Sequence, residues 1–305
     1  MAPLRPRASR FPERGRTFAP MRKLSASLLA LAFAAPVFAK EAPALKGPPL
    51  SPPAAVPADT LVPFASPESI SRLEHSQAKV DFFHLANHYE GQTNKAFCGP
   101  TSATVVLNAL RADNEKIEKP EDPSLFPAEV KGIPLPKGMD PLFHRYTQNN
   151  FFEKGSAVKT KEEVFGKPKT EGGKRDGGIQ LRQLAGMLSA HGLDVQLRIA
   201  DEKLTDAQIR AELVKNLQTE NDYVIINYHR PTLGQRGGGH ISPVAAYDAK
   251  SDSFLILDVN PNGQTWVWAQ GDALLKSLRT KDVEENRGYL LVKEGPAPTA
   301  EQTPR

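Results

Sequence analysis

The sequence contains a single cysteine, Cys98, in 305 residues. One cysteine cannot form an internal disulfide, and it cannot contribute to a cysteine-rich zinc centre. Both of these ways of stabilising a chain are therefore excluded. Because a lone cysteine is most often a small buried apolar residue, its sequence surroundings must decide whether it has a chemical role.

The apolar stretch near the N-terminus is too short to cross a bilayer. It extends from Leu24 to Ala35, follows two basic residues and precedes the small residues that end at Ala39, whereas a transmembrane helix needs about 20 apolar residues. This order is typical of a secretory signal peptide. We predict that translation begins at Met21 and that residues 1–39 form a leader. Cleavage after Ala39 then places the protein in the periplasm or outside the cell, without stable membrane insertion. A leader retained as a membrane anchor is the alternative.

A strong charge imbalance is absent outside this leader. The formal net charge is +4 at pH 7, and residues 1–20 alone hold five arginines and one acid. The remainder is near neutral and gives no indication of a nucleic-acid-binding face. Residues 40–65 are rich in proline and alanine and predict a linker, residues 66–293 are long enough for one well-buried domain, and residues 294–305 predict a disordered tail.

The residues around Cys98 favour a nucleophile. Gly99 and Pro100 follow it, and apolar residues then recur with helical spacing to Leu110, which predicts a helix with one buried face. Cys98 would lie at the N-terminus of this helix, where the helix dipole and unpaired N–H groups stabilise a thiolate. Gln92, six residues upstream, carries a side-chain amide that could donate to an oxyanion.

His240 is the best candidate for the base among seven histidines. It follows the glycine-rich run "LGQRGGG" and precedes two apolar stretches, 241–247 and 253–259, which flank turn residues and predict a hairpin. A hairpin centred on residue 249 places His240 opposite Asp258. A carboxylate there holds one ring nitrogen and leaves the other for the thiol. An ordinary hairpin with a chance histidine and aspartate is the alternative. His191, before Gly192, is instead typical of a cation at a helix C-terminus.

The other segments predict a mixed α+β fold. Helical patterns begin at Leu181 and after Thr205, which has a capping-box partner in Gln208. Strand patterns cover "DVQLRIA", "DYVIINY", "TWVWA" and "GYLLVK". Helices dominate the N-terminal half and strands the C-terminal half. We therefore expect the Cys98 helix to pack against an antiparallel sheet and to face His240 and Asp258 across a cleft.

Several long motifs resemble the phytochelatin synthase family, in particular its short, single-domain bacterial type, within the papain-like cysteine peptidase clan. They are "LANHYEGQTNKAFCGPTSATVVLNAL", "YTQNNFF", "NYHRPTLGQRGGGHISPVAAYDAKSDSFLILDV" and "RGYLLVK", in this order over residues 80–293. The resemblance implies a papain-like cysteine-protease fold for a catalytic domain at residues 66–293. By motif position it implies six site residues: Cys98 as nucleophile, His240 as base, Asp258 as orienting acid, Gln92 as oxyanion donor, and Arg287 and Gly239 beside the bound substrate.

The resemblance also implies an activity. In this family the cysteine attacks the Cys–Gly bond of glutathione, glycine leaves, and a γ-glutamylcysteinyl thioester passes to water or to a second thiol peptide. Eukaryotic members have a further cysteine-rich domain, and the family typically has an arginine and a lysine after the catalytic aspartate. This sequence has neither, since "VNPNGQTWVW" follows instead. We therefore expect water to be the main acceptor and γ-glutamyl peptide synthesis to be weak or dependent on stimulation by metal ions.

The sequence predicts no built-in cofactor and no built-in metal site. His84 and His88 are four residues apart, but a chance pair is the favoured interpretation. Cd²⁺ or Zn²⁺ is expected to act only as a metal-thiolate form of the substrate. Glutathione and γ-glutamyl peptides are the expected partners, and a homodimer is compatible with the sequence. Two alternatives stay open: a cysteine peptidase of the bacteriocin-processing kind, and a non-catalytic protein that binds thiol peptides or metal thiolates.

Overall fold

The structure is a computed structural model that describes residue 57 and residues 60–121, 132–262 and 265–296. The predicted signal peptide and its cleavage site lie outside the described residues. All elements below belong to one compact unit within residues 51–305. No helix in the described part of the chain has both the length and the apolar character that crossing a bilayer requires.

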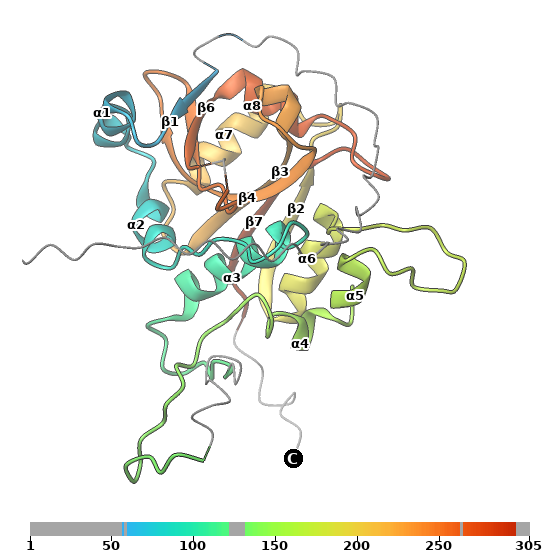
Figure 1. The fold of residues 1–305 in the computed structure, drawn as a ribbon. Helices are drawn as coiled ribbons and strands as arrows, with labels where there is room; N and C mark the ends of the chain where they lie inside the picture. The colour runs from blue at the N-terminus through green and yellow to red at the C-terminus, as the bar shows by residue number, and fades with distance from the viewer. Residues whose placement is uncertain (1–56, 58–59, 122–131, 263–264, 297–305) are drawn as a thin grey trace, which may run out of the picture. The chain divides into compact units, whose positions relative to one another are not determined.

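A single antiparallel sheet organises this unit (Figure 1). Its seven strands lie in the order β1-β6-β5-β4-β3-β7-β2, and each neighbouring pair is antiparallel. In chain order the strands are β1 (Leu61–Pro63), β2 (Leu193–Ile199), β3 (Asp222–His229), β4 (Gly239–Asp248), β5 (Ser253–Ile256), β6 (Val267–Gln270) and β7 (Gly288–Glu294).

Helices cover both faces of the sheet and divide the core into two clusters. The first cluster joins one face of the sheet to α2 (Val80–Asn87), α3 (Cys98–Arg111) and α6 (Leu181–Ala190), and the second joins the other face to α7 (Asp206–Asn216) and α8 (Gly271–Leu278). Figure 1 shows these two groups on opposite sides of the strands. The other α-helices in the described residues are α1 (Pro67–His75), α4 (Phe152–Gly155) and α5 (Lys161–Val164). The predicted α+β class is confirmed.

The helix and strand assignments from the sequence are largely confirmed. The expected helix after Cys98 is α3, and the capping box at Thr205 is present, with its hydroxyl accepting from Gln208 N–H at the start of α7. His191 differs from its prediction. It is buried against Phe151, and its Nε2 lies 2.8 Å from the Phe151 carbonyl. Burial lowers the pKa of His191, so it is a neutral core residue and not a helix-terminal cation.

The folded part extends beyond the predicted linker and tail boundaries. Leu61–Pro63, at the end of the predicted linker over residues 40–65, forms β1 and pairs with β6. Glu294, the first residue of the predicted tail over 294–305, ends β7, and its carboxylate pairs with Arg111 of α3 at 2.6 Å. The composition of these segments misplaces both boundaries because a short paired strand needs only a few suitable residues.

The predicted hairpin register is wrong. Asp248 pairs with Ser253, a bulge then shifts the register, and Val244 pairs with Ile256, where β5 ends. His240 therefore does not face Asp258 as a cross-strand pair. Its direct partner is Tyr228 on β3. A bulge changes which residues of two strands face each other, and the sequence pattern gave no signal for this one.

Candidate active site

Cys98 is the first residue of α3 and is partly exposed. The first turn of the helix is fixed to the sheet by Ser102, whose hydroxyl donates to the carbonyls of Cys98 at 2.8 Å and of Ile241 at 3.1 Å. Ile241 follows His240 in β4. This shared hydrogen bond therefore sets the position of the thiol relative to the strand that carries the imidazole.

The surroundings of Cys98 favour its thiolate. Burial acts to raise the pKa of the thiol. A hydrogen bond with the His240 side chain and the charge of His240 act to lower it, and so do backbone hydrogen bonds from Ile241 and Gly99. The net effect is a lowered pKa. An ionised thiol beside an imidazole is the form that attacks carbonyl groups.

His240 lies between the thiol and a carboxylate. Its Nε2 is 3.0 Å from Asp258 Oδ1, which leaves Nδ1 for the thiol of Cys98. Burial acts to lower the pKa of His240, but the hydrogen bonds with Asp258 and Cys98 raise it above the ordinary value. The structure thus brings together the three residues that the sequence singled out, although by a different register from the predicted one.

Asp258 is fully buried and accepts hydrogen bonds from several donors. Arg230 Nη2 donates at 2.7 and 2.8 Å, the Tyr228 hydroxyl at 3.0 Å, and Asn260 N–H at 2.9 Å. Burial acts to raise the pKa of Asp258, but His240, the charge of Arg230 and the N–H of Asn260 lower it overall. The carboxylate is therefore held ionised, as an acceptor that orients the ring of His240.

Arg230 and Tyr228 are the functional residues that sequence reasoning missed. Both are buried, and burial followed by the Asp258 charge raises the pKa of Tyr228, so its hydroxyl stays a donor. Tyr228 could have been found, since it is the β3 partner of His240 once the β3–β4 register is known. Arg230 follows β3 directly, in a short 3₁₀ turn over Arg230–Leu233, and no spacing rule points to it.

Gln92 reaches the site through a loop that is anchored on both sides. Its backbone N–H donates to the Val259 carbonyl at 2.7 Å, next to Asp258. The neighbouring Thr93 N–H donates to Gln148 Oε1 at 2.9 Å, and Gln148 Nε2 donates to the Gly91 carbonyl at 2.9 Å. The Gln92 amide itself donates to the Asn94 carbonyl at 2.7 Å. Gln92 is thus buried close to the catalytic candidates, with one of its two amide hydrogens engaged.

A cavity of about 440 Å³ opens beside the thiol, and we call it the Arg287 cavity. Cys98, His240, Gly239 and Arg287 line it together with Asp282. Arg287 Nη2 pairs with Asp282 at 2.9 Å. The guanidinium lies directly against Gly239, because a β-carbon added there would collide with Arg287 Nη1. The two predicted substrate-contact residues, Arg287 and Gly239, therefore lie together in this cavity.

A second cavity of about 450 Å³ adjoins His240, and we call it the Arg236 cavity. It shares Lys95, Gly239 and His240 with the first. Its remaining lining comes from the loop around Gln92, the glycine-rich loop before β4 and the segment after Asp258, namely Gln92, Thr93, Asn94, Arg230, Arg236, Gly237, Gly238, Asn260, Pro261 and Asn262. The candidate active site is thus a thiol–imidazole pair between two cavities.

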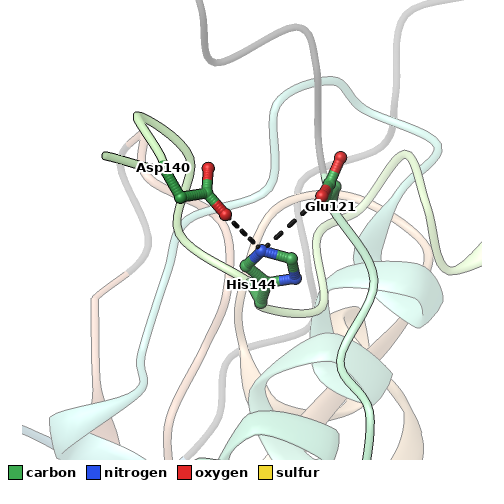
Figure 2. A group of neighbouring side chains, drawn as sticks. All are labelled: Glu121, Asp140 and His144. Atoms are coloured by element: carbon green, nitrogen blue, oxygen red, sulfur yellow. Dashed lines mark hydrogen bonds and ion pairs between the residues drawn. The ribbon is translucent and has the colours of Figure 1, made fainter. Parts of the chain in front are cut away.

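One possible metal-binding group is found among the described residues, and it lies outside both cavities. Figure 2 shows Glu121 and Asp140 pointing at Nε2 of His144, at 3.6 and 2.8 Å. All three side chains are exposed, and the hydrogen bond to Asp140 raises the pKa of His144. One nitrogen and two oxygens suit Zn²⁺ or Mn²⁺, but a proton on Nε2 satisfies the same two carboxylates. His84 and His88 do not belong to this group.

Comparisons with known proteins agree with one another. The phytochelatin synthase family model matches residues 53–122 and 136–289. The chain is 28% identical over 247 residues to a glutathione gamma-glutamylcysteinyltransferase of Lotus japonicus, covering 78% of this chain and 43% of that protein. It is 25% identical to one of Arabidopsis thaliana, covering 69% and 36%, and 22% identical to one of Schizosaccharomyces pombe, covering 70% and 43%. The chain thus spans about two fifths of the length of these relatives.

Proposed function

Because this chain belongs to the phytochelatin synthase family, we propose that it is a cysteine enzyme that cleaves glutathione at the Cys–Gly bond. Its relatives are named for transfer of the γ-glutamylcysteinyl group of glutathione. The observation that carries the proposal is the buried chain of contacts from Asp258 through His240 to Cys98, which opens on the Arg287 cavity. We also assign the domain to the papain-like group, because a thiol at a helix start faces an imidazole on a sheet.

In the proposed reaction the Cys98 thiolate attacks the cysteinyl carbonyl of glutathione. A tetrahedral oxyanion forms, and it accepts hydrogen bonds from the remaining amide hydrogen of Gln92 and from the backbone N–H of Cys98, the first residue of α3. The C–N bond then breaks, His240 gives its proton to the departing glycine nitrogen, and a γ-glutamylcysteinyl thioester remains on Cys98. Asp258 keeps the imidazole of His240 oriented while it transfers this proton.

The thioester is resolved by an acceptor that His240 deprotonates. Water gives γ-glutamylcysteine: its hydroxide adds to the thioester carbonyl, the C–S bond breaks, and Cys98 leaves as a thiolate. The proton taken from the water stays on the imidazole of His240, which restores the starting ion pair. We propose water as the main acceptor, because the segment after Asp258 that borders the site, Asn260–Asn262, carries no charged residue. A second glutathione, free or as its Cd²⁺ or Zn²⁺ thiolate, is the minor acceptor.

The γ-glutamyl end of the substrate fits the Arg287 cavity. This end of glutathione carries an α-ammonium and an α-carboxylate on one carbon. Arg287 and Asp282 supply opposite charges close together, and Asn227 bridges them, accepting from Arg287 Nη1 at 2.7 Å and donating to Asp282 at 2.9 Å. The pair is thus complementary to a zwitterionic group. We further propose that the enzyme acts in the periplasm or outside the cell, in accordance with its signal-peptide pattern.

Glycine release tests the proposal. Incubation with glutathione should give glycine and γ-glutamylcysteine, identified by mass spectrometry, and little of any longer γ-linked peptide. The Cys98→Ala variant should release no glycine while keeping its circular dichroism spectrum and melting temperature. Equal glycine release by that variant would show that Cys98 is not the nucleophile and would end the proposal.

A further inference from the structure

We propose that the Arg236 cavity binds the glycine carboxylate of the substrate, through Lys95 and Arg236. The inference rests on the proposed cleavage of glutathione and adds to it a binding site for the leaving half. Neither residue was singled out by the sequence. Lys95 belongs to the loop that leads to Cys98, and Arg236 to the glycine-rich loop that leads to His240.

The charge of the Arg236 cavity is entirely positive. Three cations line it, and no aspartate or glutamate is among its lining residues. Arg230 is already used, since it pairs with Asp258 at 2.7 Å. Lys95 and Arg236 are exposed and form no salt bridge with any residue that the structure describes. Two free cations at one cavity without a counter-charge attract an anionic group.

The two cavities differ in the way that the two ends of glutathione differ. The Arg287 cavity is lined by the shared Lys95 and by the Arg287–Asp282 ion pair, and this pair of opposite charges suits the γ-glutamyl end with its ammonium and carboxylate. The Arg236 cavity offers only positive charge, which suits the glycine end, where the amine is in the peptide bond and only a carboxylate remains. Charge alone therefore orients the tripeptide across the site.

This orientation agrees with the positions of the reacting groups. Cys98 lines the Arg287 cavity, Gln92 lines the Arg236 cavity, and His240 lines both. A peptide laid across them has its acyl part beside the thiol and its leaving nitrogen beside the imidazole. Holding the glycine carboxylate on the far side keeps the scissile carbonyl over Cys98 until His240 has protonated the nitrogen.

The positive charge of the Arg236 cavity comes from segments other than the one that follows Asp258. The uncharged stretch Asn260–Asn262, which suggested weak binding of a peptide acceptor, forms one side of this same cavity. Lys95 and Arg236 lie on the two other loops that border it. The cavity is therefore not depleted of charge, and the leaving half of the substrate has a cationic site even though the segment after Asp258 offers none.

The test compares glutathione with its glycine ethyl ester, in which an uncharged ethyl ester replaces that carboxylate. We expect Lys95→Ala and Arg236→Ala each to lower kcat/KM for glutathione about three- to fivefold, and the double variant about tenfold or more. For the ester all three variants should stay within twofold of the wild type. Lys250→Ala, which removes an exposed lysine from the β4–β5 turn, is the control and should leave kcat/KM unchanged for both substrates.

Two further measurements separate this inference from the proposed function. In the Cys98→Ala variant, calorimetry should show tighter binding of glutathione than of the ester. Adding Lys95→Ala and Arg236→Ala to this variant should make the two affinities equal. Higher salt should weaken glutathione binding more than ester binding. If this discrimination is found but the wild type releases no glycine, the cleavage proposal fails and the carboxylate site stands. If the Lys95→Ala and Arg236→Ala variants lost kcat/KM equally for glutathione and for its ester, or lost it for neither, the proposed carboxylate site would be wrong.

Discussion

At the residue scale, the proposed chemistry depends on a series of buried contacts that ends at a carboxylate. Arg230 and Tyr228 hold Asp258, Asp258 holds His240, and His240 lowers the pKa of Cys98. Cys98, His240, Asp258 and Gln92 could be identified from residue types and local patterns. Arg230 and Tyr228 could not be identified from local patterns. Tyr228 needs the β3–β4 register, which makes it the partner of His240, and Arg230 needs the tertiary position of the turn that follows β3.

Removal of the imidazole should make Cys98 an ordinary thiol. His240 is the largest favourable cause of the lowered Cys98 pKa, so His240→Ala should raise that pKa toward the usual value of about 8.5. The rate of alkylation by iodoacetamide as a function of pH measures it directly. At pH 7 we expect a slower reaction than in the wild type, with the midpoint of the profile at higher pH.

The control for this measurement is His191→Ala, since His191 is buried elsewhere in the domain and does not contact Cys98. This variant should keep the alkylation profile of the wild type even if it is less stable. A His240→Ala profile that coincides with the wild-type profile would contradict the imidazole–thiolate pair.

At the scale of elements, the site forms where the start of α3, the start of β4 and the segment after β5 meet. The elements themselves were predictable, because helix caps and apolar periodicity are local signals. The hairpin register was not, because the bulge between Val244 and Ala246 depends on packing across the sheet. Asp258 still reaches His240, since the chain beyond β5 continues along β4: Leu257 N–H donates to the Pro243 carbonyl at 2.9 Å.

The close approach of β4 to Arg287 gives a prediction for Gly239→Ala. An added β-carbon at Gly239 collides with the Arg287 guanidinium, whereas one at Gly238 meets nothing within 4 Å. We expect Gly239→Ala to displace Arg287 from Asn227 and Asp282 and to lower kcat/KM for glutathione by roughly tenfold or more, mainly through KM.

Steady-state glycine release measures this effect, and alkylation of Cys98 should remain at the wild-type rate. Gly238→Ala is the matched control, because it stiffens the same loop without reaching Arg287, and its loss of kcat/KM should be clearly smaller than that of Gly239→Ala. A loss of equal size in both glycine variants would mean that loop flexibility, and not the position of Arg287, limits the reaction.

At the scale of the whole molecule, one buried acid outside the site reduces stability. Asp81 of α2 is buried, and neither carboxylate oxygen has a hydrogen-bond partner among the described residues. Burial, with a contribution from the charge of Asp222, raises its pKa to about 9. The folded state therefore binds a proton that the unfolded chain releases near pH 4. Between about pH 4 and 9 the contribution of Asp81 to stability becomes less favourable as pH rises.

Asp81→Asn should therefore raise the melting temperature at pH 8, and by more than at pH 5. A change of 1 kcal/mol corresponds to about 3 °C for a domain of this size, so thermal denaturation followed by circular dichroism at several pH values resolves the effect. Glu220→Gln, which alters an exposed acid, is the control and should show no such pH trend. An Asp81→Asn variant that is equally destabilised at every pH would show that the carboxylate has an unrecognised partner.

The convergence of donors on Asp258 has a consequence for folding. Its partners come from the end of β3 with the 3₁₀ turn that follows it, and from the start of β4. The carboxylate therefore gains them only after these two stretches and the segment after β5 have assembled. A newly made or unfolded chain consequently carries a thiol no more reactive than that of free cysteine. The thiol therefore becomes reactive toward electrophiles at neutral pH only late in folding. The rate at which this reactivity appears during refolding reports when the last of these stretches has packed into place.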